Sequence, residues 1–136
     1  IREILFMKII SFSLWGNNPK YTIGALKNAK LAKTIYPDWI CVFHAGSDVD
    51  CFVLDELAGL DCKIVKHSDP GWNGMFWRFY DADSDDIMIS RDTDSRLNHR
   101  EKAAVDEWLS SDKDFHIMRD HPHHGTEILG GMWGCR

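Results

Sequence analysis

Two aspartates separated by one residue, Asp92 and Asp94, follow an apolar segment at 86–90 in the second half of the chain. The apolar segment predicts a buried β-strand. Two carboxylates at the end of a strand can turn toward one point, and their mutual repulsion favours a cation between them. Carboxylate oxygens suit Mg²⁺ or Mn²⁺, with water and substrate phosphates in the other positions. The spacing therefore predicts a divalent-metal site, and the alternative is a solvated turn.

Two other interpretations of this acidic region compete with a metal site of that kind. The segment 81–85 begins like a calcium loop, but the sixth position is Asp86 instead of Gly, and the twelfth, Asp92, is not Glu. A solvated acidic turn is the better interpretation there. Phosphatases of the haloacid dehalogenase type also place Asp-x-Asp after a strand. Their motif follows the first strand and continues with Thr or Val, whereas Ser95 follows the motif here.

Short apolar runs alternate along the chain with segments of helical periodicity, which predicts βαβ units. Such units build a mostly parallel sheet with helices on both faces. We therefore expect an α/β fold of three layers, Rossmann-like in topology. The expected strands are 8–13, 39–45, 62–66, 86–90, 115–118 and 128–133, and the expected helices are 21–36, a segment capped by Ser47 or Asp48, 75–80 and 97–110.

The loop after the first expected strand is a candidate ligand site, because sheets of this kind bind ligands at the carboxyl ends of their strands. An aromatic ring there can stack on a nucleobase, and an amide can hydrogen-bond to the edge of a pyrimidine. The alternative is a turn around Pro19 with a packed Trp15. The candidates are Trp15, Asn17, Asn18 and Tyr21.

Length and composition exclude several classes of protein. The 136 residues suit one domain, and 44% hydrophobic with 27% charged residues is ordinary globular composition. A formal net charge of −5 gives no basic footprint for a nucleic-acid partner. No apolar run approaches the roughly 18–20 residues of a transmembrane segment.

The four cysteines, Cys41, Cys51, Cys62 and Cys135, show no C-x-x-C spacing. We expect free thiols, a reducing compartment and a cytoplasmic location. The segment 1–6 precedes Met7, which looks like a natural start, and is interpreted as a vector remnant or a disordered leader without signal-peptide features. Residues 7–136 are then expected to form a single domain.

The segment 75–79, its acidic spacer, the apolar strand and Arg91–Arg96 together resemble the core of GT-A glycosyltransferases. The pattern is most similar to the group of retaining galactosyltransferases and glycogenin. The segment 130–134 resembles the small-residue strand that lines the sugar pocket in these enzymes. The resemblance covers most of the chain and implies a nucleotide-sugar donor, a glycan acceptor and Mn²⁺ or Mg²⁺.

The resemblance also assigns roles to individual residues. Asp92 and Asp94 would hold the metal ion, which stabilises the leaving diphosphate as a Lewis acid. Arg78 would present a planar fork to the donor; the alternative is an ion pair with one of residues 81–86. Arg91 would aid the phosphates or pair with a neighbouring carboxylate. The donor-binding residues are then Trp15, Asn17, Asn18, Tyr21, Arg78, Arg91, Gly130, Gly131 and Trp133.

A histidine-rich segment follows the fifth expected strand. A late histidine completes the metal site in some GT-A enzymes, which implies His121 or His124 as a ligand, with His123 as a further candidate. Asp120 is the candidate catalytic residue, to orient the sugar or act as a base. The alternatives are an exposed loop and a loop cap.

The resemblance predicts a short form that lacks the acceptor-binding part of these enzymes. An open apolar edge near Trp133 then predicts a homodimer, against the alternative of a monomer with a mobile tail after Ile128. The leading function is metal-dependent sugar transfer in glycan or polysaccharide synthesis. A nucleotide-sugar-binding module without turnover and a metal-dependent phosphohydrolase are the alternatives.

Overall fold

The computed structural model describes residues 7–68, 72–83, 86–118 and 130–136. The expectations for residues 1–6 and for a tail after Ile128 concern segments that lie wholly or partly outside these ranges. No helix in the described ranges is both long and apolar enough to cross a membrane.

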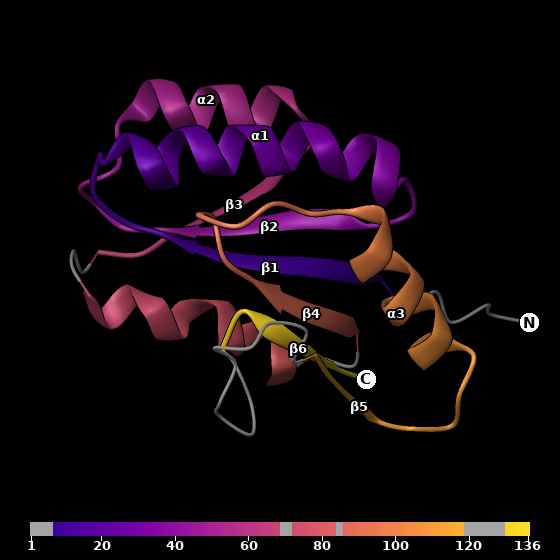
Figure 1. Cartoon of the computed structure of the whole chain (residues 1–136). Helices are drawn as coiled ribbons and strands as arrows, with labels where there is room; N and C mark the ends of the chain where they lie inside the picture. Colours follow the sequence, from indigo (N-terminus) through magenta and orange to yellow (C-terminus); the bar gives the residue numbers. More distant parts are fainter. Residues whose placement is uncertain (1–6, 69–71, 84–85, 119–129) are drawn as a thin grey trace, which may run out of the picture.

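The described residues form one sheet of six strands in the order β3-β2-β1-β4-β6-β5 (Figure 1). Neighbouring strands from β3 to β4 run parallel, whereas β6 is antiparallel to both β4 and β5. The expected mostly parallel sheet is therefore confirmed. The strands are β1 (Lys8–Leu14), β2 (Ile40–Ala45), β3 (Lys63–Lys66), β4 (Ile87–Arg91), β5 (Phe115–Ile117) and β6 (Met132–Cys135).

Helices cover both faces of this sheet, so the expected three layers are confirmed (Figure 1). On one face, α1, α2 and α3 pack over a single hydrophobic cluster, and η1, a 3₁₀ helix, lies on the other face. Phe12 and Phe43 stack within the cluster with ring centroids 4.7 Å apart. The helices are α1 (Pro19–Ile35), α2 (Cys51–Gly59), η1 (Trp72–Asp83) and α3 (His99–Leu109).

Side chains alternate between the two faces of a strand, so Ser11 and Ser13 both lie on the face of β1 beneath η1. Both side chains are buried there. The Ser11 hydroxyl lies 2.7 Å from the Arg78 carbonyl oxygen, and the Ser13 hydroxyl accepts the Arg78 N–H at 2.9 Å. Hydrogen bonds from β1 therefore fix the middle of η1 over the sheet.

Asp81 ties the next turn of η1 to the same two strands. Its carboxylate lies 2.8 Å from Nε2 of the buried His44 on β2 and 2.7 Å from the Ser11 hydroxyl. Burial raises the pKa of Asp81, but the hydrogen bonds from His44 and Ser11 outweigh it and hold this pKa below its usual range. The backbone beside Arg78 is thus held at two neighbouring points.

Some element boundaries differ from the expected ones. Asp50 caps α2 by accepting the Phe52 N–H at 2.9 Å, where Ser47 or Asp48 was expected. The 3₁₀ helix η1 is longer than the expected helix at 75–80. The last strand begins only at Met132, after a turn at Gly130 and Gly131.

Candidate functional site

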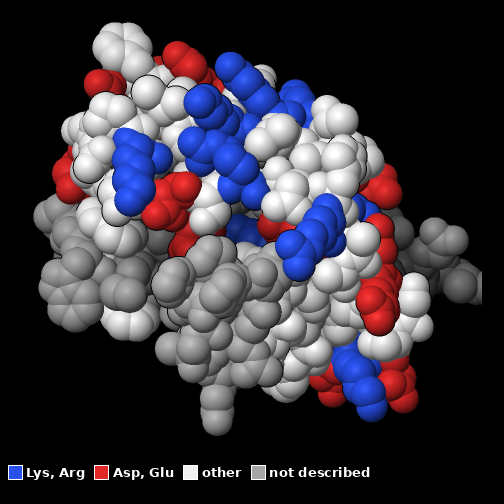
Figure 2. Space-filling model, viewed as in Figure 1, with Lys and Arg blue, Asp and Glu red and all other residues white. Residues whose placement is uncertain are grey.

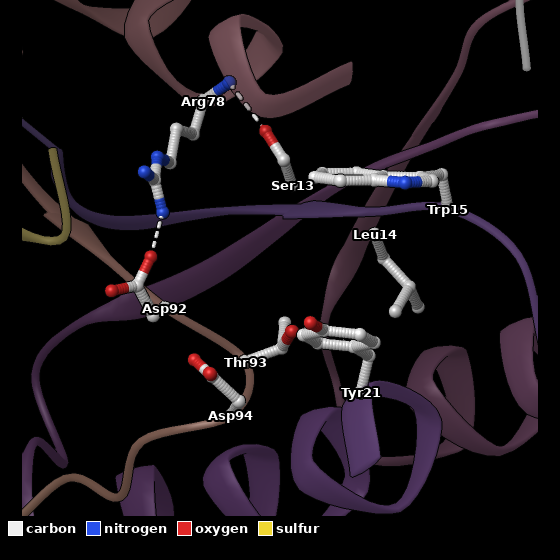
Figure 3. Close-up of a pocket in the computed structure, with 8 residues that line it drawn as sticks. All are labelled: Ser13, Leu14, Trp15, Tyr21, Arg78, Asp92, Thr93 and Asp94. Carbon is white, nitrogen blue, oxygen red and sulfur yellow. Dashed lines mark hydrogen bonds and ion pairs between the residues drawn. The ribbon is translucent and has the colours of Figure 1, made fainter. Parts of the chain in front are cut away.

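A pocket of about 220 Å³ opens at the carboxyl ends of the neighbouring parallel strands β1 and β4. Three elements and one loop supply its walls, and Figure 3 shows their side chains around a common space. This is the edge at which sheets of this topology bind ligands. The lining residues are Ser13, Leu14 and Trp15 from the end of β1, Tyr21 from α1, Arg78 from η1, and Asp92, Thr93 and Asp94 from the loop after β4.

Both carboxylates of the Asp-x-Asp motif line this pocket, and each lies near a cation. Asp92 forms an ion pair with Nη1 of Arg78. Asp94 lies 3.7 Å from Nζ of Lys20, which is largely exposed. An exposed ion pair such as Lys20–Asp94 contributes little to stability, so Asp94 can bind another cation instead.

The chemistry of these two carboxylates fits a magnesium or manganese ion. Such ions are commonly held by one or two carboxylates, with water and substrate phosphates as the remaining ligands. The described part of the chain contains no cluster of three or more His, Cys, Asp or Glu side chains suited to a metal. The expected ligands His121 and His124, and the expected catalytic Asp120, lie outside the described residues.

Arg78 is buried and held on several sides. Its Nη1 also donates to the Arg91 carbonyl oxygen at 3.2 Å, and its guanidinium lies over the Phe79 ring at 5.3 Å. Its Nε is buried without a hydrogen-bond partner among the described residues. The alternative of an ion pair with the 81–86 segment is replaced by the ion pair with Asp92, which brings the guanidinium into the pocket wall.

Asn28 on α1 holds the loop that carries the Asp-x-Asp motif. This side chain is fully buried. Its Nδ2 donates to the Ser95 carbonyl oxygen at 2.8 Å, and its Oδ1 accepts the Leu97 N–H at 3.1 Å. Asn28 was not among the residues predicted from the sequence, although a single amide on the alanine face of a helix is a usable signal.

Three glycines lie where a side chain would collide with this site. A Cβ on Gly24 of α1 would meet the Thr93 carbonyl oxygen, so α1 packs directly against the motif's backbone. A Cβ on Gly131 would meet the Asp92 carboxylate, and one on Gly130 would lie 2.8 Å from Nη2 of Arg78. The turn at the expected donor residues Gly130 and Gly131 therefore leaves room for the Arg78–Asp92 pair.

Two aromatic rings form the other wall of the pocket. Trp15 and Tyr21 are stacked with ring centroids 6.5 Å apart and planes 19° apart. Their faces suit a flat ligand. Both residues were expected at the donor site, and the structure brings them into the same pocket as the carboxylates.

The amides expected beside these rings have other partners. Asn17 Nδ2 donates to the Asp48 carbonyl oxygen at 2.8 Å, and its Oδ1 accepts the Asp50 N–H at the same distance. Asn18 caps α1 by accepting the Lys20 N–H at 3.0 Å. Both amides therefore stabilise loops, and a contact from either of them to a base stays a prediction.

Arg91 points to the opposite face of the sheet from Arg78. As the last residue of β4, it follows Ser90, which faces η1, and so turns toward α3. It is 3% exposed and forms an ion pair with Glu101, which also accepts the Tyr36 hydroxyl at 3.0 Å. The expectation of a donor contact is corrected: Arg91 pairs with a carboxylate in the core.

Trp133 lies outside the pocket lining. Its ring packs against Phe79 with centroids 5.7 Å apart. It also borders a separate apolar hollow with Phe115 and Ile117, both of which are exposed on the edge strand β5. The structure therefore places Trp133 beside η1 and β5, away from the stacked Trp15 and Tyr21.

Neither a protein-family model nor a curated protein sequence matches the chain. Solved structures do match it. Glucosyl-3-phosphoglycerate synthase of Mycobacterium tuberculosis is 13% identical with a TM-score of 0.58, over 96% of this chain and 57% of that protein. The described residues share the fold of this synthase, a mostly parallel sheet with helices on both faces.

Two further solved structures give the same picture. The same synthase in complex with uridine diphosphate is 15% identical with a TM-score of 0.56, over 96% of this chain and 56% of that one. A mycobacterial protein is 13% identical with a TM-score of 0.58, over 96% and 53%. The chain thus spans somewhat more than half the length of these structures, and the likeness shows the shared fold.

Proposed function

We propose that this chain transfers a sugar from a nucleoside-diphosphate donor to a glycan acceptor, with the help of a divalent cation. The observation that carries the proposal is the pocket itself. It brings two carboxylates, a buried guanidinium and a stacked aromatic pair together at the carboxyl edge of a glycosyltransferase-type sheet. A structure of the same fold is in complex with uridine diphosphate, which supports a nucleotide-containing ligand for this chain.

Each lining group matches one part of such a donor. Asp92 and Asp94 would hold the cation, which supplies Lewis-acid stabilisation of the leaving diphosphate. Arg78 would shift part of its hydrogen bonding from Asp92 to a phosphate oxygen, for which its planar fork is suited. Trp15 and Tyr21 would flank the base. The 75–79 segment and the Asp-x-Asp motif resemble those of retaining galactosyltransferases and glycogenin. The proposed subclass is therefore a retaining glycosyltransferase.

The charge of the surrounding surface favours an anionic ligand locally. Figure 2 shows Lys and Arg side chains gathered over α1, although the whole chain carries a net charge of −5. Lys20, in the first turn of α1, lies beside Asp94. Basic groups near a cleft raise the local concentration of an anionic substrate.

A homodimer stays part of the proposal. Phe115 is 68% exposed and Ile117 43% exposed on β5, an edge strand of the described sheet. Apolar side chains on an open edge favour pairing with a second chain. Light scattering at micromolar concentration tests this: a mass of two chains supports the homodimer, and a mass of one chain contradicts it.

The function is tested by incubating the protein with a panel of uridine-diphosphate sugars, with Mn²⁺ or with EDTA. The proposal expects Mn²⁺-dependent release of uridine diphosphate together with free or transferred sugar. Asp94→Asn should lose this release, and Asp112→Asn, an exposed carboxylate on the turn after α3, serves as the matched control. Binding without release would support the binding module instead, and release of inorganic phosphate would support a phosphohydrolase.

A further inference from the structure

Cys41 and Cys62 lie next to each other at the amino-terminal side of two paired strands. The parallel pairing of β2 with β3 begins at Val42 and Lys63, so the two cysteines directly precede the first paired positions. Neighbouring strands lie about 4.8 Å apart. A disulfide requires Cα atoms about 4.4–6.8 Å apart, so the backbone meets the requirement for a bond between these residues.

Both side chains belong to the same face of the sheet. Cys41 is buried in the cluster beneath α1, and Cys62 packs against that cluster. The Cys62 thiol lies 3.9 Å from the Leu60 carbonyl oxygen. The register of β2 and β3 places Cys41 and Cys62 opposite each other on this face, and both line one hollow, so a bond between them needs no rearrangement of the sheet.

One of the two thiols is open to small molecules. Cys62 is partly exposed, whereas Cys41 is 5% exposed. Both line a hollow of about 180 Å³ between the end of α1 and the end of α2, with Lys33 and Asp61 at its rim. A reagent of the size of hydrogen peroxide therefore reaches Cys62 first.

The surroundings favour the thiolate on Cys62. The neighbouring Cys41 thiol lowers the pKa of Cys62, and Lys33 acts in the same direction, against the effect of burial. The neighbouring Cys62 thiol and burial both raise the pKa of Cys41. A thiolate is the reactive form of cysteine, so the two residues differ in reactivity as well as in access.

We propose that Cys41 and Cys62 are a redox pair, in which Cys62 is the thiol attacked by peroxide and Cys41 is the resolving thiol. The Cys62 thiolate attacks one peroxide oxygen, the O–O bond breaks, and sulfenic acid and hydroxide form. The Cys41 thiol then attacks the Cys62 sulfur, the S–S bond forms, and water leaves. One peroxide is reduced by two electrons, and the two thiols are oxidised to one disulfide.

This site is separate from the nucleotide pocket. Cys41 begins the buried part of β2 at its amino end, whereas the pocket is built at the carboxyl ends of β1 and β4. The proposal therefore does not depend on the proposed sugar transfer. Cys51 is exposed on α2 and Cys135 is buried in β6, so either can be replaced without touching the pair.

The test uses Cys51→Ser, because its tryptic peptide 34–63 contains only Cys41 and Cys62 as thiols. After treatment of the folded protein with peroxide, this peptide should become lighter by two hydrogen atoms, and dithiothreitol should reverse the change. In Cys41→Ala, dimedone should label Cys62. In Cys62→Ser, labelling of Cys41 should be at least about tenfold slower.

Two results would overturn the proposal. One is a peptide that keeps both thiols after peroxide treatment that oxidises free glutathione in the same tube. The other is a disulfide that joins Cys41 or Cys62 to Cys135 or to a second chain in place of the internal bond. Cys41→Ala leaves a cavity at a buried position and can disturb the packing around it. The mass change in Cys51→Ser does not require that variant, so it tests the proposal by itself.

Discussion

Arg78 on η1 and Asp92 at the end of β4 form an ion pair across the wall of the pocket. The guanidinium is almost fully buried, whereas the carboxylate is 42% exposed, so the pair has one anchored partner and one accessible partner. The Asp92 carboxylate can therefore bind a cation on its exposed side, while Arg78 keeps its hydrogen bond to the Arg91 carbonyl oxygen.

Arg78→Lys should weaken the binding of uridine diphosphate by at least about tenfold, although the charge is kept. A lysine cannot contact the Arg91 carbonyl oxygen, Asp92 and a phosphate at once, as a planar fork can. Titration calorimetry in the presence of Mn²⁺ measures the effect, with Arg100→Lys on the exposed side of α3 as control. Equal affinities for wild type and Arg78→Lys would limit Arg78 to a structural role.

Asn28→Ala should loosen the motif loop without unfolding the chain. The substitution removes hydrogen bonds to the Ser95 carbonyl oxygen and from the Leu97 N–H, and each buried bond contributes about 1 kcal/mol. We expect a fall of about 2 kcal/mol in the free energy of unfolding by urea. Mn²⁺-dependent nucleotide binding should fall as well, whereas Thr34→Ala, at an exposed position of the same helix, should change neither. A folded Asn28→Ala protein with full Mn²⁺-dependent affinity would show that the loop keeps its shape without this residue.

Glu101→Gln should be strongly destabilising. It leaves the Arg91 guanidinium buried without a carboxylate, and loss of one partner of a buried ion pair costs about 3 kcal/mol or more. Burial and the negative charge of Glu101 raise the pKa of Tyr36, so all three groups belong to one network. Urea unfolding of Glu101→Gln is compared with Glu107→Gln, an exposed carboxylate on the same helix. Similar midpoints for the two variants would contradict this account of Arg91.

The stability of the fold should fall between about pH 6.5 and pH 4 because of His116. Burial, with a smaller effect of Arg91, lowers the pKa of His116 from 6.5 to about 4. In this window the unfolded chain takes up a proton on His116 and the folded chain does not, so acid favours unfolding. The loss from this residue is at most about 3 kcal/mol, and none of it is expected above pH 7.

His116→Phe should flatten that part of the pH profile. Phe fits the stacked position beside Trp108, where the imidazole ring now lies at 5.4 Å. His99→Phe, at the exposed start of α3, is the control. The explanation fails if wild type and His116→Phe lose stability in parallel from pH 6.5 to pH 4.

The fold was largely predictable from the sequence, because its strongest signals are local. Apolar runs mark the four parallel strands, and the alanine stripe of α1 and the Asn98 cap of α3 mark helices. The Asp-x-Asp pair at a strand end placed one wall of the pocket correctly. The antiparallel direction of β6 was not predicted, because an apolar run contains no signal for the direction of its strand in the sheet.

The partners of individual polar side chains were harder to predict, because they come from distant segments. Asn17 is satisfied by the backbone of Asp48, and Asn28 by the backbone after the motif. Arg91 turns toward α3 because of its phase on β4, since a shift of one residue along a strand moves a side chain to the other face of the sheet. A single sequence contains no direct signal for such long-range contacts.

The most direct test of the central claim is the calorimetric titration of uridine diphosphate into the wild-type protein and Asp94→Asn, each with Mn²⁺ and with EDTA. Asp94 is chosen because its surface contact with Lys20 contributes little to the fold. The account predicts that wild type binds only with Mn²⁺, that Asp94→Asn loses at least about tenfold in affinity, equivalent to about 1.4 kcal/mol, and that Asp112→Asn binds as wild type does. Equal affinity with Mn²⁺ and EDTA, or equal affinity of wild type and Asp94→Asn, would contradict it.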